Sequence, residues 1–153
     1  SRNVLHASPD EKTLPFTQSY TDDNTIAYCF HSVPGIQQIG KYFGNASSDG
    51  TYVHCGFKPA FVMVKSIGSV GGNWVMYDNS RDEYNPVRNK MFADVGNGMN
   101  VSNPTGTALS DNHVHFMANG FKLASNNTWT NGSGEAYLFI AIAEAHHKFA
   151  TGG

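Results

Sequence analysis

Short runs of apolar residues recur along the chain, separated by segments rich in Gly, Asn, Ser and Pro. Within several runs, apolar and polar residues alternate: Val53 and Cys55 share one side, and Tyr52 and His54 share the other. This period of two is that of a half-buried β-strand. The pattern predicts about nine short strands, at residues 25–32, 36–43, 51–55, 60–65, 73–78, 90–93, 113–117, 121–124 and 135–144.

The segments between these runs carry turn signals. Asn119-Gly120 lies between the seventh and eighth predicted strands and is a strong signal for a tight hairpin. The Gly-rich residues 68–72 separate the fourth and fifth strands, which we also expect to form a hairpin. Many short strands at regular spacing are typical of sandwiches. The sequence therefore predicts an all-β fold, an antiparallel, jelly-roll-like β-sandwich with long polar loops.

The start of the chain has a different character from the remainder. Residues 1–24 are polar, contain the acidic pair Asp22 and Asp23, and show no sustained periodicity. We therefore predict an N-terminal arm or linker at residues 1–24 and a β-sandwich domain at residues 25–153. The first residue is Ser1 rather than Met, which favours a piece of a longer fibre.

Charge and length exclude several classes of partner. The 153 residues include 10 Lys and Arg against 12 Asp and Glu, a formal net charge of −2. A protein that binds the phosphate backbone of nucleic acids, or an anionic membrane surface, carries a basic patch instead. The longest apolar stretch, residues 136–143, is far shorter than the roughly 18–20 residues of a membrane span. We expect neither a nucleic-acid partner nor a membrane partner.

The two cysteines, Cys29 and Cys55, are too few for a disulfide framework. Free thiols are the favoured interpretation, because a buried cysteine behaves as a small apolar residue. A single bridge between neighbouring strands is the alternative.

Motifs for catalysis or for a cofactor are lacking. There is no Gly-x-Ser-x-Gly elbow, and the Gly-rich segments lack the Lys and the helix of a phosphate-binding loop. His113 and His115 are spaced to share one face of a strand, but no further ligand stands at a matching interval. We predict that the protein is not an enzyme and has no cofactor and no metal site.

Binding of a carbohydrate is the more promising chemistry. Sugar sites combine an aromatic ring with hydrogen-bonding side chains. Trp129 lies in a polar segment between Asn127 and Asn131, where a loop anchor packed on the sandwich edge is the alternative interpretation. A second combination of an aromatic ring with hydrogen-bonding side chains is Tyr84 with Asn85 and Arg81. The candidate ligand-binding residues are Trp129, Asn127, Asn131, Tyr84, Asn85 and Arg81.

An ordered set of phrases resembles a known family. The phrases are Lys41-Tyr42-Phe43-Gly44-Asn45, Asp49-Gly50-x-x-Val53, Gly56-Phe57-Lys58-Pro59-Ala60-Phe61-Val62-Met63-Val64-Lys65, Trp74-x-x-Tyr77-Asp78, Arg81-x-x-Tyr84-Asn85-Pro86, Asn119-Gly120-Phe121-Lys122-Leu123 and Ala141-x-x-Glu144. In this order they resemble a repeat domain of tailed-bacteriophage structural proteins, of the marine-phage, tail-fibre-like type, over residues 25–148. The resemblance implies a location in the virion, on the tail or the capsid, and brings no catalytic residues.

Two functions follow as hypotheses. The first is a tail-fibre or adhesin domain that recognises the host surface, with a glycan or lipopolysaccharide as ligand. Such fibres are symmetric, so we expect a homo-oligomer, with a trimer favoured, and contacts to other virion proteins. The second is a capsid decoration or cement protein. The arm suits this role, because a segment that orders on a partner wraps a large surface; its large apolar residues are Val4, Leu5, Leu14 and Phe16.

Overall fold

The computed structural model describes residues 29–68, 71–94 and 113–144. The chain divides into two units, Ser1–Phe30 and His31–Gly153, and every described strand lies in the second. The predicted arm at 1–24, the first half of the predicted strand at 25–32 and the polar segment at 96–111, between the sixth and seventh predicted strands, lie outside the described residues. The boundary at residue 24 stays a prediction.

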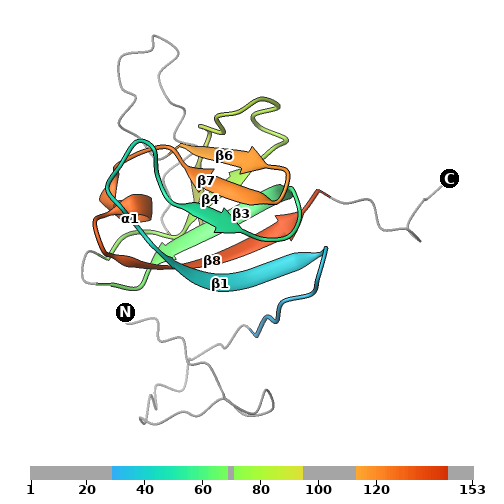
Figure 1. Ribbon diagram of the computed structural model, residues 1–153, viewed down its shortest axis with the longest axis horizontal. Coiled ribbons are helices and arrows are strands. Elements are labelled where there is room, and N and C mark those ends of the chain that lie inside the picture. Colours follow the sequence, from blue (N-terminus) through green and yellow to red (C-terminus); the bar gives the residue numbers. More distant parts are fainter. Residues whose placement is uncertain (1–28, 69–70, 95–112, 145–153) are drawn as a thin grey trace, which may run out of the picture. The chain divides into compact units, whose positions relative to one another are not determined.

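Two antiparallel sheets form the fold (Figure 1). The five-stranded sheet has the order β1 (Gln37–Phe43), β8 (Ala136–Ala143), β3 (Pro59–Ser66), β4 (Val75–Asp78) and β5 (Met91–Phe92). The three-stranded sheet has the order β2 (Tyr52–His54), β7 (Gly120–Leu123) and β6 (Val114–Met117). The prediction of an all-β antiparallel sandwich is confirmed.

Side chains from both sheets meet in one core. On β3, Val62 and Val64 are fully buried while Met63 between them is only half-buried. This alternation is what a strand with one face on the core produces. The aromatic residues of the core also touch one another: the rings of Tyr42 on β1 and Tyr137 on β8 stack with centroids 5.1 Å apart.

Eight of the predicted strands are present, but the first is wrong where the structure describes it. Residues 29–32 form no strand, and the Phe30 side chain is 57% exposed. The chain turns between Val33 and Gln37, which bridge each other, and then enters β1. At the free edge of β1 the Ser32 hydroxyl accepts a hydrogen bond from the Ile39 N–H (3.0 Å) and donates one to the Ile39 carbonyl (3.3 Å). A side chain thus occupies part of the edge that a further strand would pair with.

Both predicted hairpins are confirmed, because β3 pairs with β4 and β6 with β7. In the second, Ala118 and Asn119 form the turn and Gly120 already belongs to β7. The Asn119 carbonyl accepts hydrogen bonds from the N–H groups of Cys55 and Gly56, so this turn also holds the end of β2.

The apolar runs that contain Phe61 and Trp74 favour a place in the core for both rings, but in the structure the two residues are only half-buried. The alternation along β3 and β4 directs Phe61 and Met76 away from the core side chains of Val62 and Tyr77. An apolar residue on the outer face of a sheet has the same sequence signature as a core residue, so the sequence pattern does not distinguish the two positions.

The segment between β4 and β5 crosses from one sheet to the other. Val87 within it forms a bridge with Val114 at the start of β6 and is 1% exposed. The loop at residues 79–89, between two of the predicted strands, therefore closes one side of the sandwich. Within the described part of the chain, no helix is long and apolar enough to cross a membrane.

Candidate functional site

A pocket of about 370 Å³ lies where this loop meets the ends of β3 and β8. We name it the Tyr84 pocket, and its lining residues are Lys58, Asn79, Asp82, Glu83, Tyr84, Asn85, Val87, Phe116 and Glu144. They come from separate stretches of the chain, and the fold brings them together. Two of the sequence-predicted site residues, Tyr84 and Asn85, are among them.

Asn85 fastens the loop to the edge of β6. Its side-chain amide donates a hydrogen bond to the Phe116 carbonyl, its side-chain oxygen accepts one from the Phe116 N–H, and both measure 2.8 Å. The peptide bond from Asn85 to Pro86 is cis. The side-chain amide of Asn85 thus bonds both backbone groups of Phe116, as a neighbouring strand would. Asn85 therefore positions Tyr84, and its amide is not free to bind a ligand.

Asp82 secures the other limb of the loop. Its Oδ2 accepts hydrogen bonds from the N–H groups of Arg88 and Asn89, both at 2.6 Å, and its Oδ1 accepts one from the Asn89 side chain at 2.8 Å. A carboxylate bonded in this way is a structural element of the loop. The base of the pocket is therefore held on both sides of Tyr84.

The rim of the pocket is polar and open to solvent. The Glu144 carboxylate contacts the Lys58 ammonium at 2.5 Å and accepts a hydrogen bond from the Asn79 side chain at 3.1 Å. Both charged side chains remain about half exposed, at 51% for Lys58 and 42% for Glu144. Such an exposed pair contributes little to stability, so these groups can turn toward a ligand at small cost.

Tyr84 supplies an exposed aromatic ring at the mouth of the pocket. It is 81% exposed, the largest exposure among the large apolar side chains that the structure describes. Glu83 beside it is also exposed. An aromatic face in water next to amide and carboxylate groups is the arrangement that a sugar ring with its hydroxyls fits.

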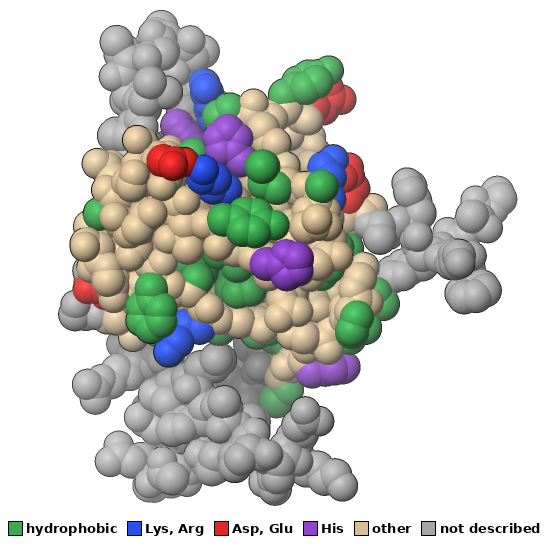
Figure 2. All heavy atoms as spheres, viewed as in Figure 1, with side chains coloured by type: hydrophobic (Ala, Val, Ile, Leu, Met, Phe, Trp, Pro, Cys, Tyr) green, Lys and Arg blue, Asp and Glu red, His purple; other side chains and the backbone are tan. Residues whose placement is uncertain are grey.

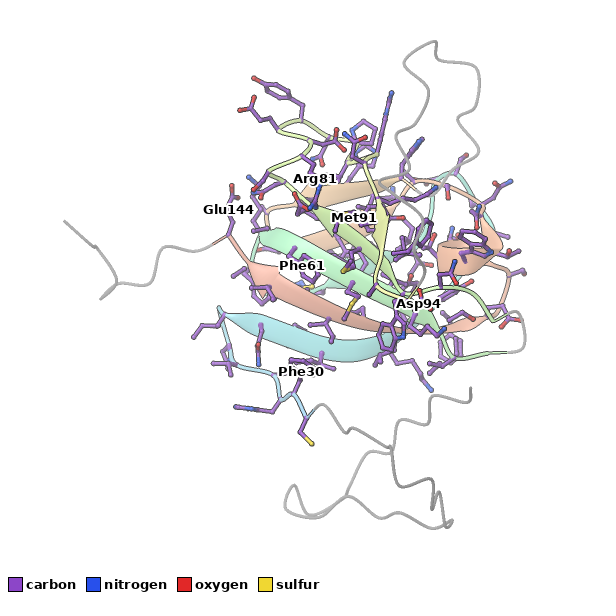
Figure 3. The ribbon with its side chains drawn as sticks, turned by 180° about the vertical axis from the view of Figure 1, so that it is seen from behind. Phe30, Phe61, Arg81, Met91, Asp94 and Glu144 are labelled. Carbon is purple, nitrogen blue, oxygen red and sulfur yellow. The ribbon has the colours of Figure 1, made fainter. Side chains whose placement is uncertain are left out.

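Arg81, the third member of this predicted patch, lies outside the pocket. Its guanidinium pairs with the Asp78 carboxylate, which also accepts hydrogen bonds from the N–H groups of Ser80 and Arg81. Figure 3 shows Arg81 and Glu144 at the same end of the sheet. Arg81 therefore stabilises the turn after β4.

The Trp129 patch is a separate place on the fold. Trp129 lies in the short helix α1 (Thr128–Asn131), which we had predicted as loop. The Asn127 side chain caps this helix by accepting a hydrogen bond from the Trp129 N–H at 2.8 Å. The Trp129 ring is 36% exposed and packs edge-on against Phe92, with centroids 5.7 Å apart. These contacts match a loop anchor on the sandwich edge.

Asn131 is fully buried, and its amide is already bonded. Its nitrogen donates to the Asn45 side chain (2.9 Å) and to the carbonyls of Ser47 (2.9 Å) and Ser125 (2.8 Å). Its oxygen accepts from the Asn45 N–H at 3.0 Å. Asn127 and Asn131 thus hold α1 and the β1–β2 connection, and Trp129 is the most exposed of the three side chains.

A second pocket, of about 300 Å³, lies between β1 and β2 and was not predicted. Its lining includes Gln38, Lys41, Tyr52, His54 and Phe139. Gly40 leaves room here, because a Cβ at this position would lie 2.8 Å from the Phe139 ring. The sequence did contain one signal for this pocket, because the alternation along β2 predicts that Tyr52 and His54 share the side away from the core.

Potential metal ligands and both cysteines lie in the described ranges. No group of three or more His, Cys, Asp or Glu side chains there could hold a metal ion. Both cysteines are free: Cys29 is exposed, whereas Cys55 is buried. Burial raises the pKa of the Cys55 thiol to about 11, which makes it unreactive at neutral pH.

His115 gives the fold a pH dependence. Partial burial, followed by the positive charges of Lys122 and Arg88, lowers the pKa of His115 below its ordinary 6.5. The unfolded chain therefore binds this proton more readily, so stability is lost as the pH falls below about 6.5. We expect His115→Gln to show a smaller decrease of the melting temperature than the wild type between pH 7.5 and 5.5. Equal decreases would contradict this role.

Comparison with known proteins gives one match. A family model described as a domain of unknown function, DUF7483, matches residues 3–146, which is most of the chain. No curated protein and no solved structure matches.

Proposed function

Since the chain belongs to the DUF7483 family, whose function is unknown, we propose one from its geometry and sequence: a virion domain of tail-fibre or adhesin type that binds a host-surface glycan. The observation that carries the proposal is the Tyr84 pocket, where an exposed ring stands on a loop fixed by Asn85 and Asp82. A ring held on a rigid support binds with little loss of conformational entropy.

The charges of the pocket favour a neutral glycan over an acidic one. Its carboxylates belong to Asp82, Glu83 and Glu144, against the single ammonium of Lys58. An acidic polysaccharide or a phosphate group would meet net repulsion. Hydroxyl groups, in contrast, both donate to carboxylates and accept from amides. The volume of about 370 Å³ lies in the lower part of the range of small-molecule sites.

Binding, rather than catalysis, is the role that these side chains favour. Hydrolysis of a glycoside requires two carboxyl groups that are free to exchange protons across the bond. In the pocket Asp82 accepts three hydrogen bonds from its own loop, and Glu144 is shared between Lys58 and Asn79. We therefore propose that the domain recognises its ligand without transforming it.

The position in the virion and the oligomeric state rest on the resemblance to tail-fibre-like proteins. We propose a homotrimer, because such fibres are closed symmetric assemblies and a repeated weak site then gains avidity. A capsid decoration protein is the second candidate. The observation favouring it is the apolar outer face of the five-stranded sheet, which suits contact with a shell protein; Ile39, Ile140, Met63, Met76 and Met91 align there across the five strands.

Variants of Tyr84 test the glycan site. We expect Tyr84→Ala to weaken binding of the fluorescently labelled full chain to host cells about tenfold, because the stacking ring is worth roughly 1–2 kcal/mol. Tyr84→Phe keeps the ring and should stay within about twofold of the wild type. Since Tyr84 is highly exposed, neither variant should alter the fold.

Isolated capsids serve as the competing target in this experiment. The adhesin is supported if the wild type binds cells saturably and if, of the variants tested, only Tyr84→Ala weakens that binding. Binding to capsids and not to cells would replace it by the decoration protein. Trp129→Ala tests the other patch. If it weakened binding to cells more than Tyr84→Ala does, the glycan site would lie at α1 and not at the Tyr84 pocket.

A further inference from the structure

The pocket between β1 and β2, which we name the Tyr52 pocket, differs in charge from the Tyr84 pocket. The polar side chains in its lining belong to Gln38, Lys41, Tyr52 and His54, beside the buried Tyr42. None of the described residues that line it carries a carboxylate, whereas the Tyr84 pocket has three carboxylates and one ammonium. An anion that the Tyr84 pocket repels therefore meets no like charge in the Tyr52 pocket.

The deepest part of the Tyr52 pocket is apolar, and it exists because residue 40 is glycine. Gly40 of β1 is aligned with Phe139 of β8, and a Cβ at Gly40 would lie 2.8 Å from the Phe139 ring. Phe139 and Val53, which both line the pocket, are almost fully buried members of the core. The missing side chain at residue 40 thus leaves an apolar floor between the two edge strands.

Two aromatic rings stand at the rim of the pocket. Tyr52 is 47% exposed, and its ring centroid lies 6.5 Å from that of His54, two residues further along β2. Val53 between them points into the core, so both rings share the outer side of the strand. Hydrophobic and His side chains are exposed on the side of the molecule that carries the three-stranded sheet (Figure 2). An exposed ring beside an apolar floor suits the apolar face of a sugar.

Lys41 supplies a cation at the same place. It is exposed on β1, and its ammonium lies 5.0 Å from the centre of the exposed Phe43 ring. The ion pairs that lysines form within the described residues belong to Lys58 and Lys122. An exposed cation–π contact is weak, and the lysine stem is flexible. The Lys41 ammonium can therefore turn toward an anion at small cost.

We propose that the Tyr52 pocket binds an acidic saccharide, with the sugar ring on Tyr52 and its carboxylate on the Lys41 ammonium. Gln38 and His54 provide hydrogen-bonding groups for the hydroxyls. A charge-assisted hydrogen bond is stronger than a neutral one, so the carboxylate distinguishes this ligand from a neutral sugar. The site goes beyond the proposed function, because its ligand class differs from that of the Tyr84 pocket and its residues are separate.

A titration of the isotopically labelled full chain with trigalacturonic acid tests the proposal. The methyl ester of the same trisaccharide is the neutral control, and the shifts of the backbone amides of Tyr52 and His54 are the readout. We expect saturable binding of the acid, with an affinity at least about tenfold higher than that of the ester.

Matched variants separate the charge from the ring. Lys41→Gln should lower the affinity for the acid about tenfold, to that for the ester, whereas Lys58→Gln removes the ammonium of the Tyr84 pocket and should change it less than about twofold. Tyr52→Ala, read at His54, should weaken binding of the acid about tenfold through loss of the ring. All three side chains are exposed, so the fold should be retained.

The outcomes that overturn the proposal are distinct from failure of the glycan site. Absence of saturable shifts at Tyr52 and His54 with the acid would overturn it, as would equal affinities for acid and ester or for the wild type and Lys41→Gln. If inorganic phosphate bound at these amides as tightly as the acid, a phosphate site would replace the saccharide site. Tyr84→Ala should leave the affinity for the acid unchanged, and a loss in this variant would also count against a separate site.

Discussion

Replacing Gly120 with Ala is expected to lower the free energy of unfolding by about 3 kcal/mol or more. A Cβ at this position would lie 2.0 Å from the Val53 carbonyl oxygen and 3.1 Å from the Cys55 nitrogen. Both are backbone atoms at β2, the strand that β7 pairs with, so they cannot move without opening the pairing of His54 with Gly120. The three-stranded sheet would lose its edge strand.

Thermal unfolding followed by circular dichroism measures this effect. The expected decrease of the melting temperature is at least about 6–12 °C. Gly134→Ala is the matched control, because Gly134 has a φ of +67° but nothing within 4 Å of an added Cβ. It should cost only about 1 kcal/mol, the penalty of the left-handed backbone itself. Equal losses in the two variants would contradict the close approach of β2 and β7.

Asn131→Ala is expected to have an effect of similar size, about 3 kcal/mol. The change removes a fully buried amide and leaves the carbonyls of Ser47 and Ser125 and the N–H of Asn45 without that partner. Buried polar groups without partners are costly, because no water replaces the lost bonds. The connection from β1 to β2 and the helix α1 should loosen together.

Asn126→Ala provides the comparison, since Asn126 is exposed in the same polar segment. It should change the free energy of unfolding by less than about 0.5 kcal/mol. Urea unfolding of both variants gives the two values. If Asn131→Ala were as mild as Asn126→Ala, Asn131 would be available to a ligand, as the sequence had indicated.

Much of the fold could be predicted from the sequence because apolar runs, period-two alternation and turn residues are local signals. The run at β8 and the hairpin at Asn119 follow from neighbouring residues alone. The orientation of Phe61 and Trp74 could not be predicted, since it depends on which face of the sheet the second sheet covers. The four residues of α1 are too few to produce a helical period.

The candidate site was only partly predictable for a related reason. Tyr84 and Asn85 are adjacent to each other in the chain, but Lys58 and Glu144 reach the pocket from the ends of other strands. Asn131 has a side chain typical of sugar-binding sites, but its amide forms hydrogen bonds within the fold instead. Short polar side chains cap helices, hold turns and bind ligands with the same groups, so only their partners in space distinguish these roles.

The most direct test of the glycan site is a titration of the isotopically labelled full chain with neutral oligosaccharides from bacterial surfaces, followed by NMR of the backbone amides. We expect saturable shifts that centre on Tyr84 and Asn85 and extend to Lys58 and Glu144, with no shifts around Trp129. Shifts centred on Trp129, or an absence of saturable shifts with every neutral oligosaccharide, would contradict it.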